Sequence, residues 1–285
     1  MSLRIVALGD SVTTGVGDAV LPDFQPGWVA HLARLVGATD VCNLARMGAR
    51  ARDVLSDQVP EVHGQDVHVV TLLVGGNDVL RKDFDPARVG QTVREICARF
   101  SKATSVVVVL LHDPQRVLPT FSGDAGRVIA RRAAAVNDEV RRLVSADESV
   151  IVVDISTEPG AHDLKNWHID RMHPSPTGHR WLARVVADAM AERGLVTVSE
   201  CEDPVPPTPS RWIQLAWFIA AGVPWAIKRS VDLLPELVSV IVADRKQLRR
   251  EITLETKQGS LYASLASGDP DRARTGDLRR DRAAR

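Results

Sequence analysis

The sequence predicts an α/β fold in which a five-stranded parallel sheet lies between two layers of helices. Along residues 1–198, short apolar runs alternate with longer segments whose apolar residues recur every three or four positions. Such alternation favours parallel strands joined by right-handed helical crossovers. Small or polar residues follow several of the apolar runs directly, as expected for an open sheet that binds a ligand at the carboxyl ends of its strands.

The predicted strands are apolar and largely β-branched, which is typical of strands covered by helices on both faces. They are Leu3–Leu8, Thr39–Leu44, Val67–Val74, Ser105–Leu111 and Val150–Asp154. The predicted helices have one apolar side and an outer side rich in arginine. They are Gly27–Val36, Asp85–Lys102, Asp124–Val144 and Thr177–Arg193, the last beginning after a turn stiffened by Pro174 and Pro176.

A smaller part of the chain follows this domain. Residues 199–210 have the Pro-rich, acidic composition of a linker, and residues 267–285 are charged and expected to be disordered. Between them, residues 211–266 combine apolar stretches with basic clusters. This pattern predicts short helices. The apolar run from Trp212 to Ile227 is too short to span a membrane. Tryptophans beside cations suit a peripheral membrane contact through residues 211–250, but the slightly favoured interpretation is that these helices fold back on the domain or form a dimer contact.

Composition narrows the class of protein. The chain has 285 residues, 45% of them hydrophobic, and a formal net charge of +0, so no overall basic field recruits nucleic acid. Its cysteines are few and scattered, at Cys42, Cys97 and Cys201, which argues against a disulfide framework. The first strand begins almost at Met1 and leaves no secretory leader. We expect a cytoplasmic protein, peripheral at the inner face of the membrane if residues 211–250 bind lipid. No metal or nucleotide motif occurs, and no cofactor is expected.

Four predicted strand ends carry residues suited to acyl transfer. Ser11 follows the first strand, Gly48 comes shortly after the second and Asn77 follows the third; Asp170 and His173 lie in the loop after the fifth. A serine becomes a nucleophile when a histidine takes its proton and a carboxylate fixes the tautomer of that histidine. A glycine N–H and an asparagine amide suit an oxyanion hole. Ser11 alone would indicate only a strand-to-loop turn, but the set favours catalysis.

Four blocks of the sequence resemble, in order, those of the SGNH (GDSL-type) esterases and lipases. They are Gly9-Asp10-Ser11 with Gly15, Asn43-Leu44-Ala45 with Gly48, Gly75-Gly76-Asn77-Asp78, and Asp170 with His173. The resemblance covers roughly residues 3–195 and implies a flavodoxin-like three-layer α/β/α fold. It implies that Ser11 is the nucleophile, His173 the base and Asp170 the group that orients the base. It also implies an oxyanion hole formed by the N–H groups of Ser11 and Gly48 and by the Asn77 side chain.

Neighbouring polar residues are assigned structural roles. We expect Asp10 to fix the turn before the nucleophile, Asp78 to hydrogen-bond within its own loop, and His179 to be a structural residue of the last helix. The other histidines show no metal-ligand spacing. The long segment His112–Gly123 is expected to shape the substrate pocket, or else to be a plain surface connection.

These features predict a hydrolase that cleaves a small-molecule or lipid ester through an acyl-Ser11 intermediate. An acyltransferase that uses the same intermediate is the first alternative. The second is a membrane-tethered protein whose hydrolase domain is vestigial, although the completeness of the site opposes it. Neither the acyl chain length, nor the alcohol portion, nor the oligomeric state follows from the sequence.

Overall fold

The computed structural model describes residues 3–18, 27–62, 66–117, 124–168 and 170–200. Beyond Glu200, the predicted linker, the apolar and basic segment 211–266 and the tail 267–285 lie outside these residues. Within the described part, no helix is both long and apolar enough to cross a membrane.

The predicted five-stranded parallel sheet is confirmed. Its strands are β1 (Arg4–Gly9), β2 (Asp40–Asn43), β3 (Val69–Leu73), β4 (Ser105–Val109) and β5 (Val150–Val153). They lie in the order β2-β1-β3-β4-β5, and every neighbouring pair is parallel. The observed strands are slightly shorter than the apolar runs that predicted them, because apolar residues continue into the buried first turn of several loops, as at Leu110 and Leu111.

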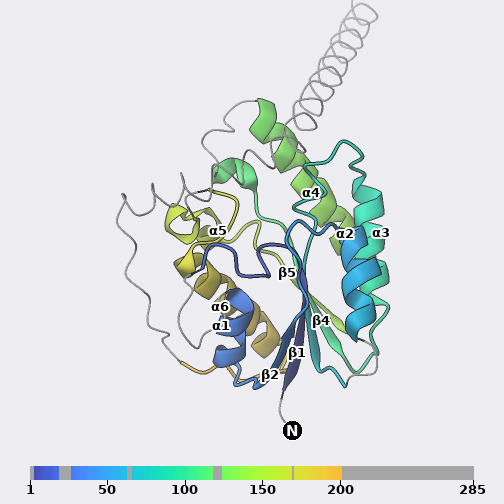
Figure 1. The fold of residues 1–285 in the computed structure, drawn as a ribbon, viewed down its shortest axis with the longest axis vertical. Helices are drawn as coiled ribbons and strands as arrows, with labels where there is room; N and C mark the ends of the chain where they lie inside the picture. Colours follow the sequence, from blue (N-terminus) through green and yellow to red (C-terminus); the bar gives the residue numbers. More distant parts are fainter. Residues whose placement is uncertain (1–2, 19–26, 63–65, 118–123, 169, 201–285) are drawn as a thin grey trace, which may run out of the picture. The chain divides into compact units, whose positions relative to one another are not determined.

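Helices cover both faces of the sheet (Figure 1). On one face lie α1 (Trp28–Leu35), α5 (Pro159–His162) and α6 (Pro176–Glu192); on the other lie α2 (Ala51–Asp53), α3 (Pro86–Cys97) and α4 (Asp124–Val144). Alternate side chains of β1 enter the two cores: Ile5 and Ala7 pack toward the α1 and α6 side, and Val6 and Leu8 toward the α3 and α4 side. Each face of the sheet therefore has its own apolar core.

Helix starts follow local capping chemistry. The Asp85 side chain accepts hydrogen bonds from the N–H groups of Ala87 and Arg88, with Pro86 as the first residue of α3. The last helix begins one residue before the predicted Thr177, because Ser175 is its cap and Pro176 occupies its first position. The predicted helix over Asp85–Lys102 also ends early, at Cys97.

The segment between β2 and β3 was not predicted to be helical. It contains α2, a π-helix η1 (Val54–Gln58) and a 3₁₀-helix η2 (Val59–Val62). Two further 3₁₀ turns, η3 (Pro114–Arg116) and η5 (Leu164–Asn166), lie in the loops after β4 and β5. None of these pieces is long enough to show a clear helical period in the sequence.

The strand order determines where a ligand can bind. The connection after β1 contains α1 and the connection after β3 contains α3, which lie on opposite faces of the sheet, so the strand order reverses between β1 and β3, and a crevice is expected outside the carboxyl ends of those two strands. Ser11 follows β1 and Asn77 follows β3. The topology therefore brings two of the predicted site residues to the mouth of this crevice.

Candidate active site

Three of the predicted residues form one chain of hydrogen bonds. Ser11 Oγ lies 2.9 Å from His173 Nε2, and His173 Nδ1 lies 2.9 Å from Asp170 Oδ2. Ser11 and His173 are 162 positions apart in the sequence, so their contact depends on the whole sheet. The His173 residue is only 5% exposed, whereas the Ser11 residue is partly exposed. The arrangement can pass a proton from the hydroxyl to the imidazole.

The loop that carries Asp170 and His173 is held by its own backbone. Asp170 Oδ1 accepts hydrogen bonds from the N–H groups of Met172 at 2.9 Å and His173 at 3.0 Å. Arg171 has a φ of 57°, in the left-handed region that residues other than glycine seldom adopt. Burial alone would raise the pKa of Asp170, but hydrogen bonds from His168 and His173 hold that pKa below its usual range. The carboxylate is therefore ionised at neutral pH.

His168 is a site residue that the sequence did not indicate. Its Nδ1 lies 3.3 Å from Asp170 Oδ2, the same oxygen that contacts His173. Its backbone N–H donates to the carbonyl of His173 at 2.9 Å. Asp170 therefore joins two histidines. One residue separates His168 from Asp170, and this spacing alone gives no signal of a shared carboxylate.

The three predicted oxyanion donors occupy adjoining loops. Within the described residues, no group accepts a hydrogen bond from the backbone N–H of Ser11 or of Gly48. The φ of Gly48 is 78°, which a residue with a side chain would adopt only with strain. Asn77 Nδ2 donates to the carbonyl of Ala49 at 3.1 Å and to Asp10 Oδ2 at 3.3 Å. Asn77 therefore ties the loop after β2 to the loop after β1.

Asp10 is buried beside the nucleophile. Its Oδ1 accepts the N–H of Val12 at 3.0 Å, which fixes the turn as expected, and its Oδ2 faces Asn77. Burial raises the pKa of Asp10 to about 6, against the opposing effects of the Val12 hydrogen bond and the nearby His173. The structure therefore gives Asp10 a second contact, to the predicted oxyanion donor.

The end of β1 is clamped by a buried glutamine that the sequence did not single out. Gln58 Oε1 accepts the N–H of Gly9 at 2.9 Å, and Gln58 Nε2 donates to the carbonyl of Gly9 at 2.8 Å. A Cβ on Gly9 would lie 2.4 Å from the carbonyl oxygen of Leu73, so only glycine fits there. The two hydrogen bonds fix the backbone immediately before Asp10 and Ser11.

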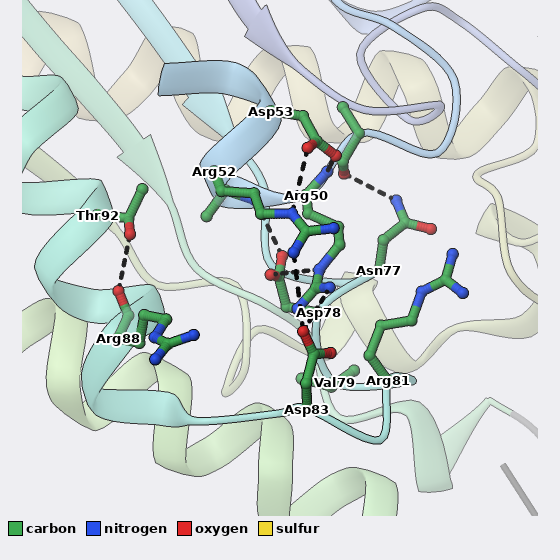
Figure 2. A network of polar contacts seen from close by, with 12 residues as sticks. Arg50, Arg52, Asp53, Asn77, Asp78, Val79, Arg81, Asp83, Arg88 and Thr92 are labelled. Carbon is green, nitrogen blue, oxygen red and sulfur yellow. Dashed lines mark hydrogen bonds and ion pairs between the residues drawn. The ribbon is translucent and has the colours of Figure 1, made fainter. Parts of the chain in front are cut away.

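The assignment of Asp78 to its own loop is wrong. Its side chain accepts from Arg50 Nε at 3.1 Å and from the backbone N–H of Ala51 at 3.0 Å, both in the segment after β2. Arg50 also contacts Asp83, with Nη1 to Oδ2 at 3.1 Å (Figure 2). Burial raises the pKa of Asp78, although the bonds from Ala51 and Arg50 oppose it. This network joins the loops that carry Gly48 and Asn77.

Two pockets lie close to the site residues. One, of about 660 Å³, is lined by Gly48 together with charged residues: Arg50, Arg52, Asp53, Arg81, Lys82 and Asp83. The other, of about 50 Å³, is mainly apolar, and Val12, Met172 and Pro174 are part of its lining. These three residues are sequence neighbours of Ser11 and His173, so the second pocket adjoins the hydrogen-bonded pair.

His112 lines the apolar pocket, consistent with the expected role of the segment that it begins; residues 118–123 of that segment lie outside the described ones. Its ring lies 4.1 Å from that of Trp167, centroid to centroid. Burial lowers the pKa of His112 to about 3, so the ring is neutral at physiological pH. Within the described residues, its Nε2 has no hydrogen-bond partner.

His179 has the structural position expected for it. It is fully buried in α6, where Nδ1 accepts the N–H of Trp28 at 3.1 Å and Nε2 lies 3.0 Å from the carbonyl of Val16. Among the residues that the structure describes, no group of three His, Cys, Asp or Glu side chains is placed to hold a metal ion.

Comparisons with known proteins agree with this architecture. The family model described as GDSL-like Lipase/Acylhydrolase matches residues 7–181. A variant of Axe2, an acetyl-xylooligosaccharide esterase from Geobacillus stearothermophilus, has a similar structure (TM-score 0.54, 19% identity, 66% of this chain and 94% of that chain). So do an extracellular lipase from Streptomyces rimosus (0.51, 20%, 66% and 100%) and the lipase Lip_vut3 from a goat rumen metagenome (0.51, 19%, 66% and 97%).

These identities are low, so the structural likeness establishes the fold only. A search of curated proteins found no match. The family is established by the model match, which covers more than half of the chain and contains both Ser11 and His173. The chain belongs to the GDSL-like lipase/acylhydrolase family and is a carboxylic ester hydrolase.

Proposed function

We propose that this enzyme hydrolyses a short-chain carboxylic ester through an acyl-Ser11 intermediate. The observation that carries the proposal is the continuous hydrogen-bond chain from Ser11 Oγ through His173 to Asp170. Both contacts are 2.9 Å long, within the range needed for proton transfer between a nucleophile and its base.

Acylation begins when Ser11 Oγ attacks the ester carbonyl and His173 Nε2 takes the hydroxyl proton. Asp170 accepts from Nδ1–H, which leaves Nε2 as the acceptor and stabilises the imidazolium that forms. His173 then gives the proton to the departing alcohol. In the second half-reaction, the same nitrogen takes a proton from water, and the resulting attack releases the acid and restores Ser11.

The negative oxygen of the tetrahedral intermediate is assigned to three donors: the N–H groups of Ser11 and Gly48, and Asn77 Nδ2. The two backbone donors are unbonded within the described residues, which supports this role. Asn77 Nδ2 is engaged twice, and its contact with Asp10 is the longer one. In this proposal, the oxyanion replaces Asp10 as the partner of that N–H.

The small apolar pocket takes an uncharged, short part of the substrate. Its volume of about 50 Å³ is small beside the roughly 300–1,000 Å³ that is usual for small-molecule sites, so it accommodates only a short group. The similarity to an acetyl-xylooligosaccharide esterase also favours a short acyl group. Long fatty acyl chains would have to lie outside this pocket.

The proposal is tested with a series of p-nitrophenyl esters from acetyl to palmitoyl. We expect the highest kcat/KM with the shortest esters, and a fall of about 10⁴-fold or more in Ser11→Ala, because nucleophile and base act as a unit. Ser56→Ala is the matched control, since Ser56 is exposed and its hydroxyl bonds only its neighbour Asp57. Equal turnover by Ser11→Ala and wild type would refute the assignment of the nucleophile.

A further inference from the structure

The charged pocket beside Gly48 is large enough to hold part of a substrate. Its volume of about 660 Å³ lies within the range of about 300–1,000 Å³ that is usual for small-molecule sites. Gly48 both lines this pocket and supplies one of the proposed oxyanion donors. A single molecule can therefore place its ester carbonyl against that donor and another of its groups in the pocket.

The lining of this pocket is rich in positive charge. Four cationic side chains, Arg50, Arg52, Arg81 and Lys82, face two acidic ones, Asp53 and Asp83, which gives the lining a net charge of +2. Counting Asp78, which is buried behind Arg50, reduces this to +1. Because the whole chain has a formal net charge of +0, the pocket is a local concentration of positive charge.

The cations have different surroundings. The Arg50 side chain is 11% exposed and is fixed between Asp78 and Asp83, so it forms the base of the pocket. The Arg52 side chain is 66% exposed and contacts Asp53 and Asp83 at longer distances, 3.4 and 3.8 Å. Arg50 and Arg52 therefore already have acidic neighbours.

Arg81 and Lys82 add two further positive charges to the lining. Within the described residues, no acidic group pairs with Lys82, which is exposed. The backbone of Arg81 is held from both sides, because its N–H donates to the Asp78 carbonyl and its own carbonyl accepts from Arg132. Figure 2 shows the Arg81 side chain extending toward Asn77. A cation is thus directed from this loop toward the oxyanion donor.

We propose that the pocket binds an anionic group, a carboxylate or a phosphate, carried by the ester substrate. Guanidinium groups bind both anions through charge-assisted hydrogen bonds, and a positively charged pocket also raises the local concentration of an anionic substrate. The inference rests on the proposed ester hydrolysis and adds the charge of the substrate to it.

The test compares esters that differ only in charge. One pair is mono-p-nitrophenyl succinate, which carries its charge on the acyl side, and the neutral methyl p-nitrophenyl succinate. The other is 4-acetoxybenzoate and its methyl ester, which place the charge on the alcohol side. For each pair, kcat/KM of the anionic ester is divided by kcat/KM of the neutral ester. This ratio is then divided by the same ratio of the hydroxide-catalysed rates, which corrects for the different reactivities of the two esters. We expect the wild type to favour the anionic member of at least one pair by about tenfold.

Removal of the cations should abolish the preference. In Arg81→Gln/Lys82→Gln, the corrected ratio should approach one, mainly through a higher KM for the anionic ester. In wild type, the corrected ratio should also decrease as the salt concentration is raised from about 0.01 to 0.15 M, because screening weakens the interactions of exposed charges. Arg184→Gln removes a cation from α6, on the opposite face of the sheet, and should leave the ratio unchanged. Lys82→Gln alone removes an exposed side chain and provides the test should the double variant not fold.

The outcomes separate this inference from the proposed function. Ser11-dependent hydrolysis with no preference in either pair would overturn the anion site and leave the esterase intact. A preference that survives in the double variant would overturn it as well. If no ester is turned over, calorimetric binding of 4-acetoxybenzoate to Ser11→Ala still decides: binding that Lys82→Gln weakens supports the pocket, and no binding overturns it.

Discussion

Among the proposed oxyanion donors, Asn77 is a side chain whose amide nitrogen already makes two hydrogen bonds. Its amide nitrogen bonds the Ala49 carbonyl and Asp10 in the free enzyme, so a substrate oxygen must compete for one N–H. That competition favours the transition state, in which the oxygen carries most negative charge. We expect Asn77→Ala to lower kcat by about 10²–10³ with little change in KM. A change confined to KM would assign Asn77 to ground-state binding.

Asp10 provides a prediction about stability. Burial raises its pKa from 3.8 to about 6, so the folded protein retains a proton on Asp10 that the unfolded chain has already lost. The stabilising contribution of Asp10 is therefore complete below about pH 4 and is lost as the pH rises through about 6. At one pKa unit per 1.36 kcal/mol, the loss is roughly 3 kcal/mol.

Asp10→Asn carries no titrating proton and avoids this loss. The difference in free energy of unfolding, Asp10→Asn minus wild type, should therefore increase by up to roughly 3 kcal/mol between about pH 4 and 7. Any effect of the amide that does not depend on pH leaves this increase unchanged. Urea unfolding of both proteins at several pH values measures the difference. A difference that is the same at every pH would mean that the Asp10 pKa is not raised.

At the scale of elements, the π-helix η1 supports the nucleophile. Gln58, at its last position, is fully buried and bonds both backbone groups of Gly9, of which the N–H has no other partner within the described residues. Gln58→Leu preserves the volume but leaves the Gly9 N–H unpaired, whereas the Gly9 carbonyl keeps the hydrogen bond from the N–H of Arg46. We expect it to cost about 1–3 kcal/mol of stability and to lower kcat, because Ser11 lies two residues beyond the clamp.

The matched control is Gln91→Leu, which changes a half-buried glutamine of α3 whose side chain, among the described residues, bonds only Glu95 and Arg94 of the same helix. It should alter the free energy of unfolding by no more than about 0.5 kcal/mol. Denaturant unfolding and steady-state kinetics on both variants provide the comparison. If Gln58→Leu behaved like Gln91→Leu, the clamp would have no role in holding the end of β1.

Elements with strong periodicity were predictable, and irregular ones were not. The run Val67–Val74 predicted β3 within two residues because buried parallel strands are continuously apolar. Helix α4 was predicted with its observed bounds, because its apolar residues recur on one side over 21 residues that contain no proline. Residues 51–62 form three short pieces with different hydrogen-bond patterns, none of which has enough residues to reveal a period.

At the scale of the molecule, the sequence predicted the fold and the triad together. Residues placed at the ends of parallel strands meet at one edge, so Ser11 and His173 could be brought together without knowledge of any contact. Gln58, His168 and Arg50 could not be found in this way. Their roles depend on contacts between loops, such as that between Arg50 and Asp78, 28 positions apart, which follow only from the packed structure.

All five strands, both apolar cores and the candidate site lie within residues 3–200. We therefore predict that a chain ending at Glu200 folds cooperatively and keeps the turnover of short p-nitrophenyl esters. Thermal melting and kinetics beside the full-length chain test this. A clear fall in Tm or aggregation would show that later residues cover part of the domain.

The same pair of proteins tests whether residues 211–250 contact a membrane. If these residues bind lipid, the full-length chain should sediment with anionic vesicles at low salt, release them as salt rises, and lose this binding on truncation at Glu200. Equal sedimentation of both chains would place any lipid binding in the catalytic domain. No sedimentation of the full-length chain would leave a dimer contact as the alternative.

The proposed reaction depends on Ser11 as the nucleophile and on His173 as the base that activates it. The most direct measurement is labelling by a p-nitrophenyl alkylphosphonate, which leaves a slowly hydrolysed phosphonyl group on an activated serine, followed by peptide mass mapping. We expect one label per chain, on the peptide that contains Ser11, formed far more slowly in His173→Ala. A label on any other residue, or undiminished labelling of Ser11→Ala, would contradict it.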